Sequence, residues 1–402
     1  MEESGKVLAF PQAPDAVELR HLRAFVAVAE ELNFGRAAER LHISQPALSR
    51  QIRALEQLVG TELFRRSRQG VALTLAGEAL LDRARKLLSD IDEAVAAAQS
   101  VGGEQIARIA RLWEPVQDKA GADADLQEMR DAYEQLLAQF EMPPEISVRP
   151  VNAGGVSSLV VGADPVAPPT ILLLHGGGHV LGSAFGYRPL AGALARAAGS
   201  GVLVADYRLA PEHSHPAALD DAMAAYAWIL EQGVDPGAVS VSGDSAGGGL
   251  AVSLLLALKE RELPQPGGAL LFCPAVDLQG NLERPADDPR HAIALEVTQR
   301  LTTVYLGDHP TDDPILNPLR ADLTGLPPLL IQGASGDHVV ADAHALAKRG
   351  RKHNVYTRLE VYPVEAHVFH LFWSFLPEAA EALQACGRFA REIGSGARAE
   401  SA

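Results

Sequence analysis

The sequence has little of several features that define other classes of protein. Only two cysteines occur in 402 residues, Cys273 and Cys386, which excludes a disulfide framework and a cysteine-rich zinc site. No apolar run approaches the roughly 20 residues that a membrane-spanning helix requires. Residues 1–15 contain acids and prolines but no apolar core, so they do not have the pattern of a signal peptide. These absences predict a protein of the reducing cytoplasm that has no membrane association.

What the chain does contain predicts several folding units and one basic surface. A chain of 402 residues is too long for one ordinary core, and an apolar content of 47% is usual for globular protein. The chain carries a net charge of −16, yet residues 20–70 hold nine arginines against five glutamates, a net of +4. A basic block in an acidic protein indicates a local anion-binding surface. Surface arginines are common, so charge alone does not identify nucleic acid.

Residues 19–75 have the pattern of a DNA-reading module. Apolar residues at helical spacing predict a helix over 19–30, and Asn33 is a favourable N-cap for a second short helix. Ser44 and Pro46 suit the first turn of a third helix. Two short helices and a turn before a helix with a polar, basic face are typical of a helix-turn-helix, whose second helix enters the major groove. The side chains on that face are Gln45, Ser49, Arg50 and Arg53.

A basic wing follows the third helix. Arg65, Arg66 and Arg68 precede Gly70 and a short β-prone run over residues 71–75. Arginines beside a short strand pair can contact phosphates and position a recognition helix without reading bases. We therefore add Arg65 and Arg66 to the predicted DNA contacts.

These segments resemble the winged helix-turn-helix of LysR-type transcription regulators over residues 19–75. The matching segments are Phe34–Ala38, Ser44–Ala47, Leu55–Glu56 and Leu63–Arg66. The resemblance implies that the recognition helix begins with Gln45, Pro46, Ser49 and Arg50 and that double-stranded DNA is a partner. The alternative is a degenerate module that is retained only for dimerisation.

Residues 74–100 are predicted to form one long helix. A narrow stripe of apolar side chains recurs at three-, four- and seven-residue steps, at Leu80, Leu87, Ile91, Ala94 and Ala98. Such a stripe requires a second helix, most simply its own copy in a homodimer, and LysR-type regulators are similar in having a dimerising linker helix. The pair Gly102–Gly103 is expected to end the helix. LysR-type regulators continue into a two-lobed effector domain, whereas this chain does not.

From residue 170 onward, short β-branched or leucine-rich runs alternate with helical stretches, for example 216–232 and 247–261. This alternation predicts a mostly parallel sheet wrapped by helices. An antiparallel hairpin over 146–150 and 157–161 is expected before it. The predicted parallel strands are 170–174, 202–207, 239–243, 269–273, 329–333 and 357–361.

Two glycine-rich segments follow predicted strands. Gly243–Gly247 fits G-x-S-x-G between a strand and a helix, a turn that exposes the hydroxyl of Ser245 as a nucleophile. His175–Gly178 follows the first parallel strand and can direct backbone N–H groups at a developing oxyanion. We assign Gly176, Gly177 and Ala246 as the oxyanion donors. A phosphate-binding loop is the alternative, but the Lys-Ser/Thr of a P-loop is missing.

The acid and the base that activate such a serine should follow later strands. Asp337 comes after the predicted strand 329–333, and His367 comes a few residues after 357–361. His367 would accept the proton of the serine hydroxyl, and Asp337 would orient the imidazole and stabilise its charged form. The rival acids are Asp342 and Glu365, and the rival bases are His338 and His370.

Residues 168–393 also resemble a known family, the hormone-sensitive-lipase-like esterases of the α/β-hydrolase fold. The matching segments are His175–Gly178, Asp206–His213, Gly243–Gly248, Asp337 with Asp342, and His367–Phe369. The resemblance implies the triad given above, short-chain ester or lactone substrates, and structural roles for Glu212 and Asp244. The chain departs from the family at Ser214–His215, where an aromatic residue usually precedes the proline.

Residues 106–140 are expected to supply cap helices over the acyl pocket, as in related ester and lactone hydrolases. Trp113, Met129 and Tyr133 are candidates for pocket lining, with simple packing on the hydrolase body as the equal alternative. Phe185 and Tyr187 have the same two interpretations. No residue pattern calls for a metal or an organic cofactor.

The predicted domains are 17–75 (winged helix-turn-helix), 76–103 (linker helix), 104–145 (cap) and 146–396 (α/β-hydrolase). The predicted function is a serine carboxylic-ester hydrolase fused to a LysR-type DNA-binding module. The alternative is a transcription regulator that uses the hydrolase domain to sense an ester or lactone. In that case ligand binding would act through the cap and the linker helix on the DNA-reading heads.

Overall fold

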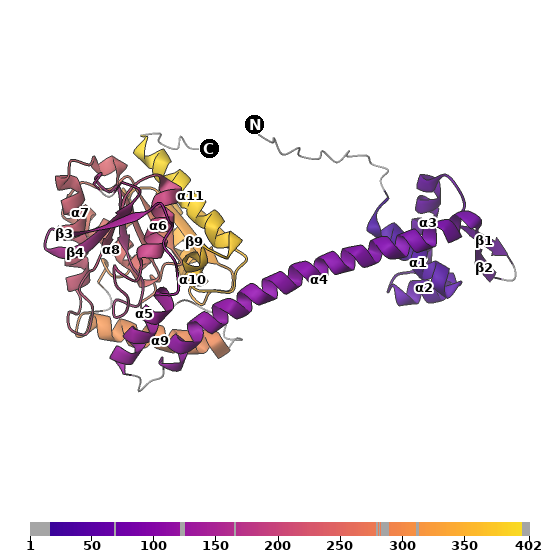
Figure 1. The fold of residues 1–402 in the computed structure, drawn as a ribbon, viewed down its shortest axis with the longest axis horizontal. Coiled ribbons are helices and arrows are strands. Elements are labelled where there is room, and N and C mark those ends of the chain that lie inside the picture. Colours follow the sequence, from indigo (N-terminus) through magenta and orange to yellow (C-terminus); the bar gives the residue numbers. More distant parts are fainter. Residues whose placement is uncertain are drawn as a thin grey trace. The chain divides into compact units, whose positions relative to one another are not determined.

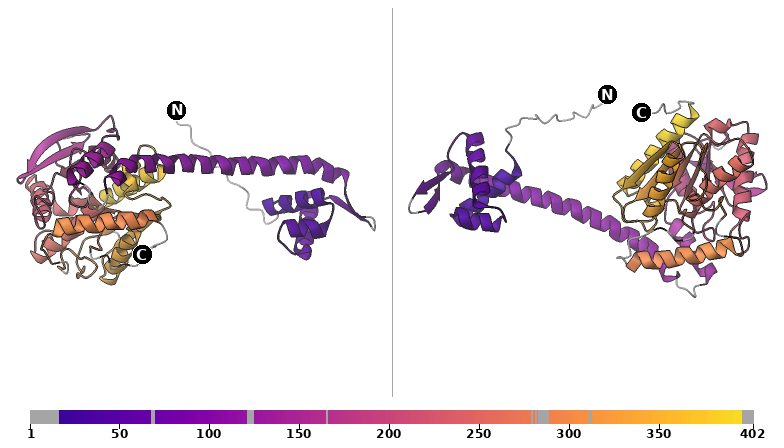
Figure 2. Two further views of the ribbon diagram at one scale, coloured as in Figure 1. Left: turned by 90° about the horizontal axis from the view of Figure 1, so that it is seen from below. Right: turned by 180° about the vertical axis from the view of Figure 1, so that it is seen from behind.

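The chain forms two compact units, residues 1–104 and residues 105–402 (Figure 1). Figure 2 shows the same units from two further sides. The computed structural model describes residues 17–67, 70–120, 125–164, 166–278, 280, 282, 289–310 and 313–395. None of the helices in these ranges is long and apolar enough to cross a membrane.

The first unit has the predicted helix-turn-helix and wing. Its elements are α1 (Leu19–Glu31), α2 (Phe34–Arg40), α3 (Gln45–Val59), β1 (Phe64–Ser67), β2 (Gly70–Leu73) and the start of α4 (Leu75–Asp118). The predicted caps are confirmed, because Asn33 Oδ1 accepts hydrogen bonds from two backbone N–H groups of α2 and Ser44 Oγ accepts one in α3. These bonds satisfy N–H groups that a helix start otherwise leaves unpaired.

A small aromatic and aliphatic core holds the first unit together. Phe25 of α1 and Leu48 and Ile52 of α3 are completely buried. The ring of Phe64, on β1, lies 5.3 Å from that of Phe25. Burial of the apolar face of α3 leaves its opposite, polar face in solvent.

Helix α4 is longer than the sequence predicted. It continues through Gly102–Gly103 to Asp118, so the prediction that these glycines end the helix was wrong. Two glycines weaken a helix by only about 1 kcal/mol each relative to alanine. Packing offsets this penalty, because Ile109 and Val116 in the last turns of α4 are buried in the core of the second unit. The helix therefore begins in the first unit and ends in the second.

The second unit is an eight-stranded sheet with helices on both faces. Its strands are β3 (Ser147–Ala153), β4 (Val156–Gly162), β5 (Ile171–Leu174), β6 (Val202–Ala205), β7 (Ser240–Asp244), β8 (Gly268–Phe272), β9 (Leu329–Ala334) and β10 (Thr357–Tyr362). Their order is β10-β9-β8-β7-β5-β6-β4-β3. Strands β5 to β10 pair in parallel, and β3 and β4 form an antiparallel hairpin at one edge. The prediction of a mostly parallel sheet is confirmed.

The connections place the helices on two faces. The helices of this unit are the end of α4, α5 (Leu126–Leu137), α6 (Arg188–Ala198), α7 (Ala217–Glu231), α8 (Ala246–Glu260), α9 (Pro289–Leu306), α10 (Val340–Lys352) and α11 (Pro377–Gly394). The chain steps from β5 to β6 in one direction and from β6 through β7 to β8 in the other. Because such crossovers are right-handed, α6 lies on the face opposite α7 and α8. Helix α11 packs on α6, and α7 packs on α8 (Figure 1).

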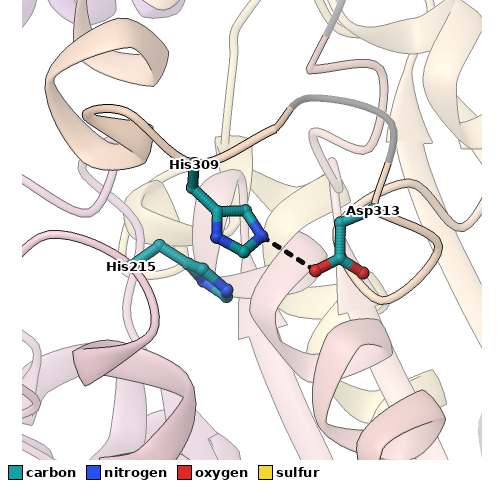
Figure 3. A group of neighbouring side chains, drawn as sticks. All are labelled: His215, His309 and Asp313. Carbon is teal, nitrogen blue, oxygen red and sulfur yellow. Dashed lines mark hydrogen bonds and ion pairs between the residues drawn. The ribbon is translucent and has the colours of Figure 1, made fainter.

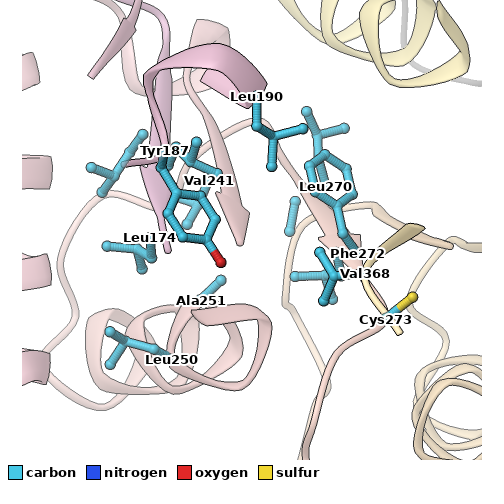
Figure 4. Packing of buried hydrophobic residues seen from close by; sticks show 14 of the residues in the cluster. Leu174, Tyr187, Leu190, Val241, Leu250, Ala251, Leu270, Phe272, Cys273 and Val368 are labelled. Carbon is cyan, nitrogen blue, oxygen red and sulfur yellow. The ribbon is translucent and has the colours of Figure 1, made fainter. Parts of the chain in front are cut away.

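The interior of the second unit is packed with aliphatic side chains from these layers. Leu174, Val241 and Leu270 lie on the three central strands and are completely buried, together with Leu250 of α8 (Figure 4). The order of the strands reverses at β5, and the carboxyl ends of parallel strands at such a reversal are where ligands bind in open α/β sheets. The functional groups are therefore expected at the ends of β5, β7 and their neighbours.

Candidate active site

Ser245 occupies a sharp turn between β7 and α8. Its backbone has φ 51° and ψ −122°, a region that is costly for a residue with a side chain. The turn is held on both sides, because the Ser245 N–H donates to the Phe272 carbonyl at 2.9 Å and the Ser245 carbonyl accepts from the Ala275 N–H at 2.9 Å. These bonds fix the side chain at the carboxyl end of the sheet.

The glycines on either side of Ser245 are required by close backbone contacts. A Cβ on Gly243 would lie 2.2 Å from the Gly247 carbonyl oxygen. A Cβ on Gly247 would lie 2.1 Å from the Leu174 carbonyl oxygen, on β5. Both distances are shorter than any van der Waals contact. The G-x-S-x-G pattern therefore reflects how tightly the turn packs on the neighbouring strand.

Three polar side chains from three strand ends meet in one row. Nε2 of His367, which follows β10, lies 2.8 Å from Ser245 Oγ. Nδ1 of the same ring lies 2.9 Å from Oδ2 and 3.0 Å from Oδ1 of Asp337, which follows β9. Each contact is within hydrogen-bond range. The serine, the imidazole and the carboxylate thus form a continuous chain of hydrogen bonds.

The electrostatics of this row favour a charged imidazole. Burial of His367 opposes protonation, but the attraction of Asp337 outweighs it, and the pKa of His367 is raised above its usual value. Burial also disfavours the Asp337 carboxylate, but His367 and His338 hold the pKa of Asp337 well below its usual range. Asp337 is 3% exposed, so water does little to screen this attraction.

Of the two rival acids, one accepts hydrogen bonds from backbone N–H groups and the other faces solvent. Asp342 Oδ2 accepts hydrogen bonds from the N–H groups of Val276 and Asp277 at 2.8 and 2.9 Å. It therefore fixes the loop after β8. Glu365 is exposed.

The rival bases also have other partners. Nδ1 of His338 lies 3.2 Å from Asp337 Oδ1, so this side chain supports the acid from its other side. His370 is completely buried, and its Nε2 lies 3.0 Å from Gln332 Oε1. Burial lowers the pKa of His370 to about 3.

The glycine loop after β5 differs from the prediction at one position. The Gly176 N–H donates to Asp244 Oδ1 at 2.9 Å, so this donor is already occupied and the assignment of Gly176 to an oxyanion hole is incompatible with the structure. Within the described residues, the N–H groups of Gly177, Gly178 and Ala246 make no hydrogen bond. Gly177 and Gly178 have φ of 105° and 64°, which explains the need for glycine there.

Asp244 connects the nucleophile turn to the cap. Its Oδ2 accepts a hydrogen bond from the Tyr187 hydroxyl at 2.8 Å, and that hydroxyl lies 2.7 Å from the Tyr133 hydroxyl on α5. Burial raises the pKa of Asp244 to about 7, although the bonds from Tyr187 and Gly176 oppose the rise. A buried network of this kind is stable only when each member has its partner.

An arginine that no sequence motif indicated fixes the cap helix. Arg130 of α5 forms a two-pronged ion pair with Glu212 at 2.8 and 2.7 Å. The same guanidinium donates to the carbonyls of Val180 and Ala210, both at 2.9 Å. Glu212 thus connects the loop before α7 to α5, and the planar fork of an arginine suits a bidentate contact with a carboxylate.

The candidates for pocket lining divide into buried and exposed residues. Met129 and Tyr133 are 1% and 4% exposed and belong to the hydrophobic core, which is the packing alternative. The ring of Trp113 lies 6.1 Å from that of Tyr133 and packs against the same core. Tyr187 is completely buried, whereas Phe185 is 63% exposed and stacks on a neighbouring arginine.

The polar face of α3 is open to solvent in the first unit. The predicted DNA contacts Gln45, Pro46, Arg50, Arg53 and Arg65 are exposed, and Ser49 is half-buried. Other arginines of this unit pair with its glutamates, as Arg36, Arg40 and Arg85 do. The side chain of Arg66 and all of Arg68 lie outside the described residues.

Comparisons with known proteins agree with both units. Residues 171–371 match the model of a family described as alpha/beta hydrolase fold. Residues 19–78 match that of bacterial regulatory helix-turn-helix proteins of the lysR family. An acetyl-hydrolase of Streptomyces hygroscopicus is 41% identical over 224 residues, which is 55% of this chain and 75% of that protein.

Further similarities cover each unit separately. An uncharacterised HTH-type transcriptional regulator of Escherichia coli K12 is 59% identical over 83 residues, 21% of this chain and 28% of that protein. The crystal structure of an esterase from the bacterial hormone-sensitive lipase family superposes with a TM-score of 0.66 at 34% identity. It covers 71% of this chain and 98% of its own.

We predict that the pKa of His367 depends on Asp337. In the wild-type protein, the imidazole should titrate above the usual value of about 6.5. In Asp337→Asn the attraction is lost while burial remains, so the pKa of His367 should fall below that of the wild type. The measurement is an NMR titration of the imidazole C–H resonances. An unchanged pKa in Asp337→Asn would contradict the prediction, and Glu365→Gln serves as the control for loss of an exposed nearby acid.

Proposed function

The chain belongs to the α/β-hydrolase family and carries a LysR-type helix-turn-helix, and from this premise we propose that it hydrolyses short-chain carboxylic esters or lactones through Ser245, His367 and Asp337. It is a carboxylic-ester hydrolase fused to a regulator module. The observation that carries the proposed triad is the chain of hydrogen bonds from Ser245 Oγ through both nitrogens of His367 to Asp337. The name of the Streptomyces relative, an acetyl-hydrolase, supports a small acyl group.

In the first half of the proposed reaction, Ser245 Oγ attacks the ester carbonyl carbon. Its proton passes to Nε2 of His367, and Asp337 stabilises the resulting imidazolium. The tetrahedral intermediate collapses when the carbon–oxygen bond to the alcohol breaks and His367 returns the proton to the leaving oxygen. The product is an acyl-serine and a free alcohol, or a tethered hydroxyl when the substrate is a lactone.

In the second half of the reaction, water takes the place of Ser245 as the nucleophile. Water donates a proton to His367 and adds to the acyl carbon, and the second tetrahedral intermediate releases the acid and restores the Ser245 hydroxyl. His367 must be neutral to begin either half. Turnover should therefore decline as pH falls through the raised pKa of this group.

The oxyanion of both intermediates is assigned to three backbone donors. We place it against the N–H groups of Gly177, Gly178 and Ala246, since none of these makes another hydrogen bond within the described residues. Gly176 is left to orient Asp244. Donors that are fixed before the charge develops need no rearrangement during the reaction.

Replacing Ser245 with alanine should abolish ester hydrolysis. Loss of the nucleophile is expected to lower kcat by about 10⁶-fold, as in other serine hydrolases. The assay is the hydrolysis of p-nitrophenyl acetate, p-nitrophenyl butyrate and small lactones by the full chain. Ser242→Ala is the matched control, because it removes a buried hydroxyl three residues earlier, on β7. Equal turnover by Ser245→Ala and the wild type would rule out the proposed nucleophile.

For the first unit, we propose that α3 reads double-stranded DNA in the major groove and that Arg65 contacts phosphate. The LysR-type helix-turn-helix supports DNA binding, and the exposed basic face of α3 supports the docking surface. We also propose a homodimer formed through α4, since two recognition helices on one duplex require two copies. The proposed DNA partner supports a site of action in the cytoplasm.

Removing a phosphate contact should lower the salt dependence of DNA binding. For Arg65→Ala, the slope of log affinity against log salt concentration should be smaller in magnitude by about one. The measurement is fluorescence anisotropy of a mixed-sequence duplex with the full chain. Arg36→Ala is the control, because Arg36 already pairs with Glu31. The same slope in Arg65→Ala and the wild type would exclude the proposed wing contact.

A second function, regulation by the ester ligand, is favoured by the continuity of α4. The helix runs from the wing of the first unit to Asp118, and its last turns are buried in the core of the second unit. We infer that ligand in the hydrolase changes DNA binding through this helix. The coupling would be reciprocal, so DNA would change ligand affinity by the same factor.

This coupling predicts that the ester alters DNA affinity only while α4 is intact. The Ser245→Ala chain, saturated with ester at fixed salt, should change its DNA affinity by about fivefold or more. Adding Gly103→Pro should abolish the change, because proline interrupts the helix at a position where a Cβ meets nothing within 4 Å. Gly103→Ala preserves the helix and is the matched control. An affinity that does not respond to ester in Ser245→Ala would contradict the regulatory proposal.

A further inference from the structure

Two histidines and an aspartate, none of them part of the catalytic row, have side chains that lie close together. His215 lies on the loop before α7, at the departure from the family pattern, and His309 and Asp313 follow the end of α9 (Figure 3). One side-chain ligand atom from each of the three lies within 4.8 Å of the others. No motif predicted this arrangement, because β7 and β8 separate His215 from the other two residues along the chain.

The backbone around the cluster holds the three side chains in place. The His215 N–H donates to the Tyr305 carbonyl at 2.9 Å, and the His309 N–H donates to the Leu306 carbonyl at 3.0 Å. Asp313 Oδ1 accepts from the Ile315 N–H at 2.9 Å. Its other oxygen, Oδ2, lies 2.8 Å from His309 Nε2. The carboxylate is therefore oriented before any ligand binds.

A tyrosine orients the first histidine. The Tyr305 hydroxyl lies 3.2 Å from His215 Nδ1, and its ring stacks on His179 at 3.8 Å. When this hydroxyl accepts a hydrogen bond from Nδ1–H, the lone pair of His215 lies on Nε2. Metal-bound histidines are commonly oriented in this way by a partner on the other ring nitrogen.

A bound cation would use all three groups, whereas the interactions of the groups with one another would not. The rings of His215 and His309 lie 4.3 Å apart, so two imidazolium ions there would repel each other. A simple ion pair between His309 and Asp313 would use only one of the two rings.

The ligand set selects the class of metal. Two imidazoles and one carboxylate are typical of Zn²⁺ and similar divalent transition metals, whereas Mg²⁺ and Ca²⁺ prefer oxygen ligands. The three residues are each partly exposed, so an ion can enter from solvent and water can complete its coordination. A second group of potential ligands, Cys273, Asp337 and His367, consists partly of the catalytic row, where the imidazole nitrogens already have partners.

We propose that His215, His309 and Asp313 bind one zinc-class divalent cation, with water as the fourth ligand. The ion would join the loop before α7 to the end of α9. None of the three residues belongs to the row of Ser245, His367 and Asp337.

The test is calorimetric titration of ZnCl₂ into untagged full-length protein that has been treated with EDTA. The wild type should bind one equivalent with an affinity that His215→Phe, His309→Gln and Asp313→Asn each weaken by about 100-fold or more. Tyr305→Phe removes only the orienting hydroxyl and should weaken binding by about 10-fold. His353→Gln is the matched control, since His353 forms an ordinary ion pair with Asp322 at 2.8 Å and has no second histidine in that pair.

A second readout separates loss of the site from loss of the fold. Zinc should raise the Tm of the wild type and of His353→Gln, but not that of His215→Phe, while all three unfold alike in EDTA. With Co²⁺ in place of Zn²⁺, the visible absorption of a histidine-bound ion should appear only where the site is intact. No zinc binding by the wild type, or equal binding by wild type and His215→Phe, would overturn the proposal.

Discussion

Ser245 has a backbone conformation that residues with a side chain avoid, and contacts with β5 and with the end of β8 hold it there. The turn is possible only because Gly243 and Gly247 carry no side chain where the chain passes β5 and folds back on itself. Hydrogen bonds to Phe272 and from Ala275 fasten the turn to the end of β8. A strained backbone conformation of this kind persists only where many surrounding contacts hold it in place. The result is a hydroxyl raised above the sheet, at the place where the ends of β9 and β10 bring a carboxylate and an imidazole.

The same turn is connected to the cap. Asp244, one residue before the nucleophile, receives hydrogen bonds from the glycine loop and from Tyr187, and Tyr187 meets Tyr133 on α5. Arg130, also on α5, adds the ion pair with Glu212. Because the last turns of α4 are buried in this same core, the helix that leaves the DNA-reading unit ends among the groups that support the nucleophile.

The sequence predicted those features that depend on neighbours in the chain. The strands, the caps at Asn33 and Ser44, and the glycine turn around Ser245 follow from local propensity and spacing. Features decided by distant packing were not predictable: α4 continues past its glycine pair because its far end is buried, and Gly176 donates to a carboxylate that lies across the sheet. Arg130 belongs to no motif. The cluster of His215, His309 and Asp313 likewise depends on where α9 ends in space.

We propose that Ser245 is the nucleophile and that His367 and Asp337 activate it. The most direct measurement is covalent labelling with an aryl sulfonyl fluoride, followed by mass spectrometry of the intact chain and of its peptides. The account predicts one adduct per chain, located on Ser245, and much slower labelling when His367 is replaced by alanine. No adduct, an adduct on another serine, or equally fast labelling without the imidazole would contradict it.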